Sequence, residues 1–298
     1  MMAALISAGL GQAQREQLAY IDFRLYFLGE VSRADISSRF GVAPTGATRD
    51  LALYRDAAPA NAVFDNRSKT YRIAPTFCPL FDHPLDRTLS ALSRGFGDGL
   101  SGIGSMLLCE FPEPINRPAT DTLAIVTRAI RAGTALSVFY ASLSGDESGR
   151  EIIPFALADN GLRWHARAFD RKSGSYRDFV LTRIRKAISI SGNTPDPSEG
   201  PTNDIQWNRI VELDLVSHPD APCPEVSSLD YPMEDGVLRL RTRAALAGYI
   251  LRRWSIDCSP DHSLHGPEYR LWLRDSFALY GVDSAVLAPS YVSPGERD

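Results

Sequence analysis

Residues 30–75 carry two short helical patterns followed at once by an alternating, strand-like pattern, an order that few folds accommodate. Ser32 is placed to cap the first helix, and Gly41 to end it. Pro44 then restarts a second helix after a three-residue turn. The apolar positions that predict the inner sides of these helices are Ile36, Phe40, Ala47, Leu51 and Tyr54. This spacing predicts a helix-turn-helix.

A β-hairpin is predicted directly after the second helix, in AVFDNRSKTYRIA (residues 62–74), with its turn at Asp65 and Asn66. A helix-turn-helix followed by such a hairpin is a winged helix. In that fold the second helix enters the major groove of DNA and the hairpin reaches the flanking backbone. The outward residues predicted to contact DNA are Thr45, Thr48, Arg49, Arg55, Arg67, Ser68 and Lys69. The alternative is a helical hairpin that contacts another protein and carries solvated charges.

A second feature is the concentration of arginines in GLRWHARAFDRKSGSYRDFVLTRI, residues 161–184. Two strands joined by a turn at 170–174 are predicted, with Trp164 on the core side. The charged residues predicted to share one surface are His165, Arg167, Arg177 and Arg183. Such a set would form a forked donor array for an anion. The alternative is a solvated sheet face with some arginines paired to Asp170 or Asp178.

The charge distribution sharpens both hypotheses, although the net charge is only −4. Residues 119–193 hold eleven Lys and Arg against seven Asp and Glu, whereas residues 194–298 hold nine against seventeen. Residues 1–75 hold nine against seven. An acidic whole therefore does not exclude a nucleic-acid partner, because the local field at the contact surface decides.

The cysteines indicate a reducing compartment, and the apolar runs indicate neither a signal peptide nor a membrane span. The four cysteines are far apart and form no C-x-x-C pair, which argues against a zinc ribbon and a disulfide framework. The N-terminus has no basic residue before Arg15, and no run of about 18 apolar residues is present. We therefore expect a cytoplasmic protein without a membrane span.

The remaining patterns predict an α+β, multi-domain chain. A helix and about five short strands in 119–193 predict a small β-barrel or curled sheet, and Pro154 predicts an edge or a bulge. A small, acidic α/β region follows from 200 to 298. Its main helix is predicted to turn Leu246, Tyr249, Ile250 and Trp254 inward. Residues 76–118 are read as a helical connector behind the winged helix of 1–75.

The segments ATRDLALYRD, FDNRSKTYR, FYASLSGDESGREIIPF, GLRWHARAFD and YRDFVLTRI together resemble a family. Over nearly its whole length the chain is similar to WYL-domain transcriptional regulators, and within them to repressors of bacterial anti-phage defence operons such as the BREX and CBASS regulators. The name-giving Trp-Tyr-Leu stands here as Trp164-His165-Ala166.

The resemblance implies a central WYL domain with an Sm/SH3-like barrel, a C-terminal extension used for dimerisation, and no cofactor. It also implies a basic pocket for a nucleotide or single-stranded nucleic acid. Carried over to matching positions, the pocket residues are Tyr140, Ser142, Arg150, His165, Arg167, Arg177 and Arg183. Tyr140 and Phe179 would border a base, and His165 would titrate near neutral pH.

Two other classes of protein remain as alternatives. The chain has no P-loop, G-x-S-x-G, H-E-x-x-H or dinucleotide motif, so neither a catalytic nor a metal site is predicted. The nearest metal pattern is CSPDHSLH, residues 258–265, and the nearest carboxylate pair for a metal-dependent nuclease is Asp146 with Glu147. A protein–protein adaptor is the other alternative. We predict a homodimeric repressor that binds an inverted repeat, and an activator would use the same parts.

Overall fold

The computed structural model describes residues 9–96, 106–110, 115–143, 145, 147–190 and 194–293. Asp146, half of the carboxylate pair considered above, lies outside the described residues. The chain divides into two compact units, residues 1–112 and 113–298, each of which is described by itself. None of the described helices is long and apolar enough to cross a membrane.

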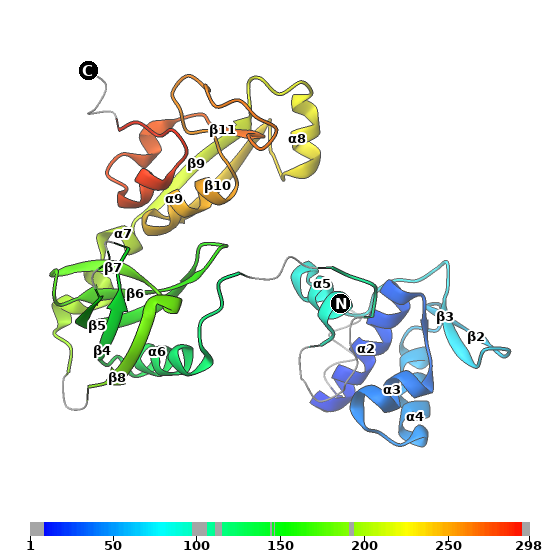
Figure 1. Cartoon of the computed structure of the whole chain (residues 1–298). Coiled ribbons are helices and arrows are strands. Elements are labelled where there is room, and N and C mark those ends of the chain that lie inside the picture. The colour runs from blue at the N-terminus through cyan, green and yellow to red at the C-terminus, as the bar shows by residue number, and fades with distance from the viewer. Residues whose placement is uncertain are drawn as a thin grey trace. The chain divides into compact units, whose positions relative to one another are not determined.

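The first unit is a small helical bundle with a three-stranded sheet (Figure 1). Its elements in chain order are α2 (Gln12–Leu28), β1 (Glu30–Val31), α3 (Arg33–Phe40), α4 (Pro44–Ala57), β2 (Ala62–Asp65), β3 (Thr70–Ile73) and α5 (Leu85–Arg94). The antiparallel sheet has the order β1-β3-β2, so the predicted hairpin is β2 and β3. This is the predicted winged helix.

The ends of α3 confirm the capping prediction. The Ser32 hydroxyl accepts a hydrogen bond from the backbone N–H of Asp35, and the Asp35 side chain accepts one from the N–H of Ser32. Gly41 closes the helix with φ of 65°, a left-handed conformation that disfavours a side chain. Ala47, Leu51 and Tyr54 are buried, as predicted for the inner face of α4.

A buried carboxylate ties the connector to this core. Asp22 of α2 is fully buried and accepts hydrogen bonds from the Tyr54 hydroxyl at 2.5 Å and the Leu80 N–H at 3.1 Å. His83 Nε2 lies 2.9 Å from its other oxygen. Helix α5 starts at Leu85 without a side-chain cap, because Pro84 stands at its N-cap position.

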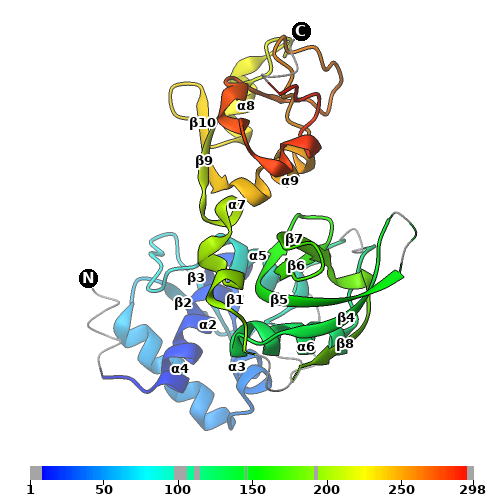
Figure 2. The ribbon, with the colours of Figure 1, turned by 90° about the vertical axis from the view of Figure 1, so that its left-hand side faces the viewer.

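The second unit begins with α6 (Thr120–Ala132) and a five-stranded antiparallel sheet. The strands are β4 (Leu136–Ala141), β5 (Glu147–Asp159), β6 (Trp164–Asp170), β7 (Ser175–Val180) and β8 (Ile184–Ser189), in the order β7-β6-β5-β4-β8. The expected closed barrel is not confirmed, because β7 and β8 remain edge strands among the described residues. Helix α6 packs on β5 and β8 (Figure 2). The register of β5 shifts between Pro154 and Ala156, which confirms the bulge.

The C-terminal part of this unit has a sheet with the order β10-β9-β11. Its main elements are α7 (Ile205–Asn208), β9 (Ile210–Ser217), α8 (Pro224–Asp230), β10 (Val237–Arg243), α9 (Ala244–Arg253) and β11 (Leu271–Leu273). The predicted inner face of α9 is wrong by one position. Trp254 is 56% exposed, whereas Ala247, Gly248 and Leu251 are buried. Gly248 is required there, because a Cβ would collide with the backbone carbonyl of Ser284.

Candidate functional site

The outer side of α4 is exposed and open at its N-terminus. Ala43 and Pro44 begin the helix, and no side chain caps it. No side chain therefore occupies the N–H groups of the first turn, and a helix N-terminus favours a phosphate. The predicted contact residues Thr45, Thr48 and Arg49 are all exposed.

The wing presents its charges at the β2–β3 turn, which Asp65 shapes. The Asp65 side chain accepts the Arg67 N–H at 2.9 Å, and its carbonyl accepts the Lys69 N–H at 2.8 Å. Arg67, Ser68 and Lys69 are exposed. Arg55, at the C-terminal end of α4, stacks over Tyr71 of β3 with 5.7 Å between its guanidinium carbon and the ring centre. Arg55 thus connects the C-terminal end of α4 to the wing.

Two of the arginines predicted to bind a ligand are used by the fold. Arg167 is buried and binds Asp204 through two hydrogen bonds, at 2.7 and 3.1 Å, and Asp178 at 3.2 Å. Arg150 binds the fully buried Asp170 at 2.6 Å. The Arg167–Asp178 pair matches the alternative reading of the hairpin, whereas Asp170, the other carboxylate considered there, pairs with Arg150 of β5.

The predicted common surface is also wrong for Arg177. In the β6–β7 ladder Arg167 stands opposite Asp178 and Arg177 stands opposite Ala168. Directly paired residues share a face, so Arg177 lies on the side away from His165 and Arg167. Its side chain is exposed and its Nε donates to the Ser175 hydroxyl.

Three aromatic residues also differ from prediction. Tyr140 is 8% exposed, and its hydroxyl accepts the Val180 N–H at 3.2 Å. Phe179 is buried edge-on against it, with ring centres 5.0 Å apart, so neither ring is free to stack on a base. Trp164, predicted in the core, is 43% exposed: it shares the β6 face of the buried Ala166 and Ala168, but it is the first residue of the strand and lies outside the buried cluster.

His165 and Arg183 do meet, in a cavity of about 260 Å³. Leu143, in the segment between β4 and β5, also lines the cavity. The neighbouring Ser142, a predicted pocket residue, is not among the lining residues and interacts elsewhere. Sequence reasoning missed the far wall, which comes from α9. The residues of that wall and of the floor are Asn160, Leu162, Arg163, Asp178, Val180, Tyr249, Arg252, Arg253 and Leu287. The only sequence signal for this wall was the Arg252-Arg253 pair at a helix end. That pair does not reveal that the helix contacts a hairpin about 80 residues earlier in the sequence.

The cavity is strongly positive. Within the part of the chain that the structure describes, Arg163, Arg183, Arg252 and Arg253 form no ion pair, and the buried Nε of Arg163 has no hydrogen-bond partner. Asp178 is the one carboxylate among the described lining residues. It accepts from Arg167 and, at 3.3 Å, from the Tyr249 hydroxyl. Burial and Asp178 raise the pKa of Tyr249 to about 12, so the hydroxyl stays protonated and donates.

His165 lies at the base of this cavity with its ring 5.4 Å from that of Tyr249. Burial lowers its pKa from the ordinary value of 6.5, and Arg163 and Arg183 lower it further against the opposing effect of Asp178. This lowered pKa argues against the expectation that His165 titrates near neutral pH in the ligand-free protein. It is a neutral hydrogen-bonding group at pH 7.

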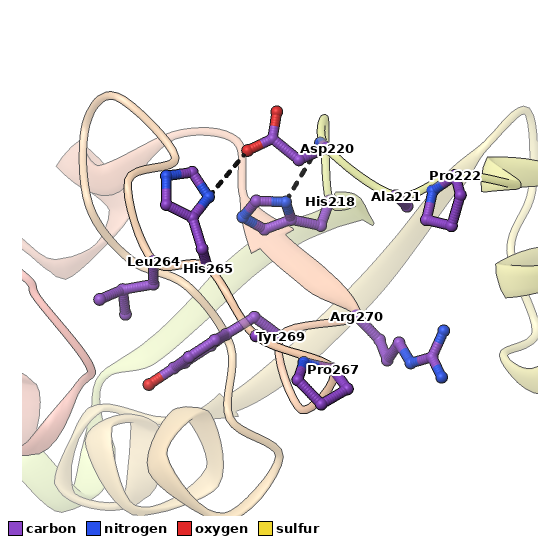
Figure 3. Close-up of a pocket in the computed structure, with 10 residues that line it drawn as sticks. His218, Asp220, Ala221, Pro222, Leu264, His265, Pro267, Tyr269 and Arg270 are labelled. Carbon is purple, nitrogen blue, oxygen red and sulfur yellow. Dashed lines mark hydrogen bonds and ion pairs between the residues drawn. The ribbon is translucent and has the colours of Figure 1, made fainter.

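A smaller cavity of about 210 Å³ lies in the C-terminal region (Figure 3). His265 Nδ1 lies 3.1 Å from the Asp220 carboxylate, and the Asp220 N–H donates to His218 Nδ1 at 3.2 Å. Cys258, from the metal pattern considered above, is buried away and its Sγ donates to the Ile256 carbonyl. No three His, Cys, Asp or Glu side chains form a metal-binding group among the described residues.

Comparisons with known proteins agree with this architecture. Three family models match: the BrxR transcriptional regulator winged helix-turn-helix domain over residues 13–94, the WYL domain over 121–188, and the BrxR transcriptional regulator C-terminal dimerization domain over 210–278. The fold and these matches define a multi-domain transcriptional regulator.

Among curated proteins, the DNA-binding transcriptional repressor CapW of Escherichia coli (strain KTE188) is 31% identical over 92% of this chain and 93% of its own length. The protein of the same name in Pseudomonas aeruginosa is 30% identical over 87% of this chain and 88% of its own. The chain belongs to this CapW/BrxR family of WYL-domain transcriptional repressors.

A solved structure, the proteasome accessory factor B/C (PafBC) of Arthrobacter aurescens, also matches. It is 18% identical over 82% of this chain and 46% of its own, so the match spans less than half of that chain. Its TM-score is 0.28.

Proposed function

We propose that this chain is a homodimeric repressor that binds an inverted repeat through two winged helices and is released by an anionic, nucleotide-type ligand. In this proposal residues 1–75 bind DNA, 76–118 connect, 119–193 sense the ligand and 200–298 hold the dimer. The observation that carries it is that the predicted contact residues of α4 and of the wing tip are exposed, with Arg55 of α4 packed on Tyr71 of the wing.

Dimerisation is part of the proposal for an electrostatic reason. The winged-helix region has only two more basic than acidic residues, so one copy makes a modest electrostatic contact. Two copies related by a two-fold axis read two half-sites and multiply the affinity. The match to a C-terminal dimerization domain supports this assembly.

The ligand half of the proposal rests on the cavity beneath α9. Four guanidinium groups against one carboxylate favour an anion, and phosphate accepts paired N–H donors well. A volume of about 260 Å³ suits a mononucleotide-sized molecule or one end of a strand. Binding favours a dimer geometry whose winged helices no longer fit the operator, and by linkage operator DNA weakens ligand binding equally.

The test of DNA recognition is footprinting and stoichiometry on the DNA upstream of the chain's own gene. We expect two protomers per site and protection of two half-sites of an inverted repeat, about one helical turn or a multiple apart. Arg49→Ala/Lys69→Ala should remove protection. Arg128→Ala/Arg131→Ala on α6 removes the same charge from exposed positions of the second unit and should leave protection intact. Equal protection by all three proteins would contradict the proposal and favour an adaptor.

A further inference from the structure

The wall that α9 contributes to the cavity lies within the region that matches the dimerization domain, residues 210–278. The opposite wall belongs to the β6–β7 hairpin and the turn that precedes it, within the WYL match at 121–188. An anion in this cavity would therefore contact both domains at once. That arrangement raises the question of whether α9 merely covers the cavity or takes part in binding.

Helix α9 is fixed against the hairpin by specific contacts. The Tyr249 hydroxyl donates to Asp178 of β7, and its ring packs on His165 of β6. The Arg253 side chain crosses directly over Gly161, where a Cβ would overlap its Cδ, Nε and Cζ atoms. Gly161 has φ of 80° in the turn before β6, so the backbone there is shaped to admit the arginine.

A second set of contacts links the sheet to the N-terminal end of α9. Arg167 of β6 binds Asp204, whose carboxylate also caps α7 by accepting the Trp207 N–H at 3.0 Å. Arg243, at the N-cap of α9, stacks over the Trp207 ring at 4.5 Å and donates to its carbonyl. The C-terminal part of α9 is thus held by cavity-lining residues, and its N-cap is linked to β6 through Trp207 and Asp204.

The packing of Arg253 over Gly161 and on the Trp254 ring does not by itself explain why two positive charges stand at the C-terminal end of α9. Basic residues are common in the last turn of a helix, because they complement its dipole. The dipole explains why Arg252 and Arg253 are basic. It does not explain why they line the same cavity as Arg163 and Arg183. Within the described part of the chain none of the four has a carboxylate partner. Their like charges repel one another, and a bound anion would offset that repulsion.

We propose that Arg252 and Arg253 of α9 complete the anion site, so that a phosphate-bearing ligand is held between the WYL hairpin and the dimerization domain. This inference rests on the proposed ligand function and adds which residues of the dimerization domain bind the ligand's phosphate. A ligand bound in this way holds α9 to the hairpin, and its binding energy acts directly on the position of the helix in the dimerization domain.

The test uses pyrophosphate as a probe, at ionic strength matched with NaCl, and follows its binding to the full chain by calorimetry. Wild type should bind, and both Arg183→Ala and Arg252→Ala/Arg253→Ala should weaken binding at least about tenfold, since each removes charge-assisted hydrogen bonds. Arg252→Lys/Arg253→Lys keeps the charge and should retain part of the affinity. Arg239→Ala/Arg241→Ala removes two exposed arginines of β10 and should bind as wild type does.

The outcomes separate this inference from the function on which it rests. Loss of binding with Arg183→Ala but not with the α9 double variant leaves the WYL pocket in place and overturns the role of α9. No binding by wild type overturns the pocket and this inference together, while DNA recognition stands. Pyrophosphate should also weaken operator binding by wild type but not by the α9 double variant. Equal weakening in both would overturn the link to the dimerization domain.

Discussion

Two groups of arginines in the second unit have the same chemistry and opposite surroundings. Arg150, Arg167 and Arg171 each meet a carboxylate at 2.6 to 2.7 Å. The cavity arginines, Arg163, Arg183, Arg252 and Arg253, meet none among the described residues. The first group closes the fold by joining distant segments, as Arg167 does with Asp204 and Arg171 with Glu199. The comparison indicates that an arginine is available to a ligand when the fold leaves it without a partner.

The largest effect should follow from breaking a pair in the first group. Arg167→Ala leaves Asp204, 1% exposed, as an uncompensated buried charge. We expect the free energy of unfolding in urea to fall by about 3–5 kcal/mol. Arg185→Ala breaks an exposed pair with Glu147 and should change it by no more than about 1 kcal/mol. Similar values for the two variants would remove the distinction between the groups.

The same measurement on the cavity group should show no comparable loss of stability. Arg183→Ala removes one of four mutually repelling charges and no ion pair of the described residues. The free energy of unfolding should therefore stay within about 0.5 kcal/mol of wild type or rise. A loss comparable to that of Arg167→Ala would show that Arg183 holds the fold together.

In the wing, one residue should have opposite effects on stability and on DNA binding. Lys69 has φ of 60°, a left-handed conformation that costs a residue with a side chain about 1 kcal/mol. Lys69→Gly should raise the free energy of unfolding of the first unit by up to that amount while weakening DNA binding. If both stability and DNA affinity fell, Lys69 would be a structural residue of the turn.

The smallest effect concerns pH and sharpens the description of the cavity. Burial lowers the pKa of His165 below 6.5, so the unfolded chain binds this proton at a higher pH than the folded chain. Its contribution to stability is therefore constant above that ordinary pKa and falls as the pH drops through it toward the folded-state value. Unfolding in urea at pH 7.5, 6.5 and 5.5 should show a shallower decline for His165→Gln than for wild type. Parallel declines would place His165 outside the buried environment.

The winged helix was predictable because its signals are local. Ser32 and Asp35 form a capping box within four residues, and Gly41 ends the helix next to it. The cavity depends instead on long-range register. Opposite pairing of Arg177 with Ala168 turns that arginine away, and α9 reaches the hairpin only through the tertiary fold. The inner face of α9 was shifted by one position because Gly248 packs on the Ser284 backbone, a contact that hydrophobic periodicity does not record.

The central claim, that this chain recognises DNA through α4 and the wing, is tested most directly by the salt dependence of its affinity for the DNA upstream of its own gene. For wild type, the logarithm of the association constant should fall steeply and linearly with the logarithm of salt concentration. Arg49→Ala/Lys69→Ala should weaken binding and reduce the slope by about one for each phosphate contact removed. An unchanged affinity and slope in that variant would contradict the claim.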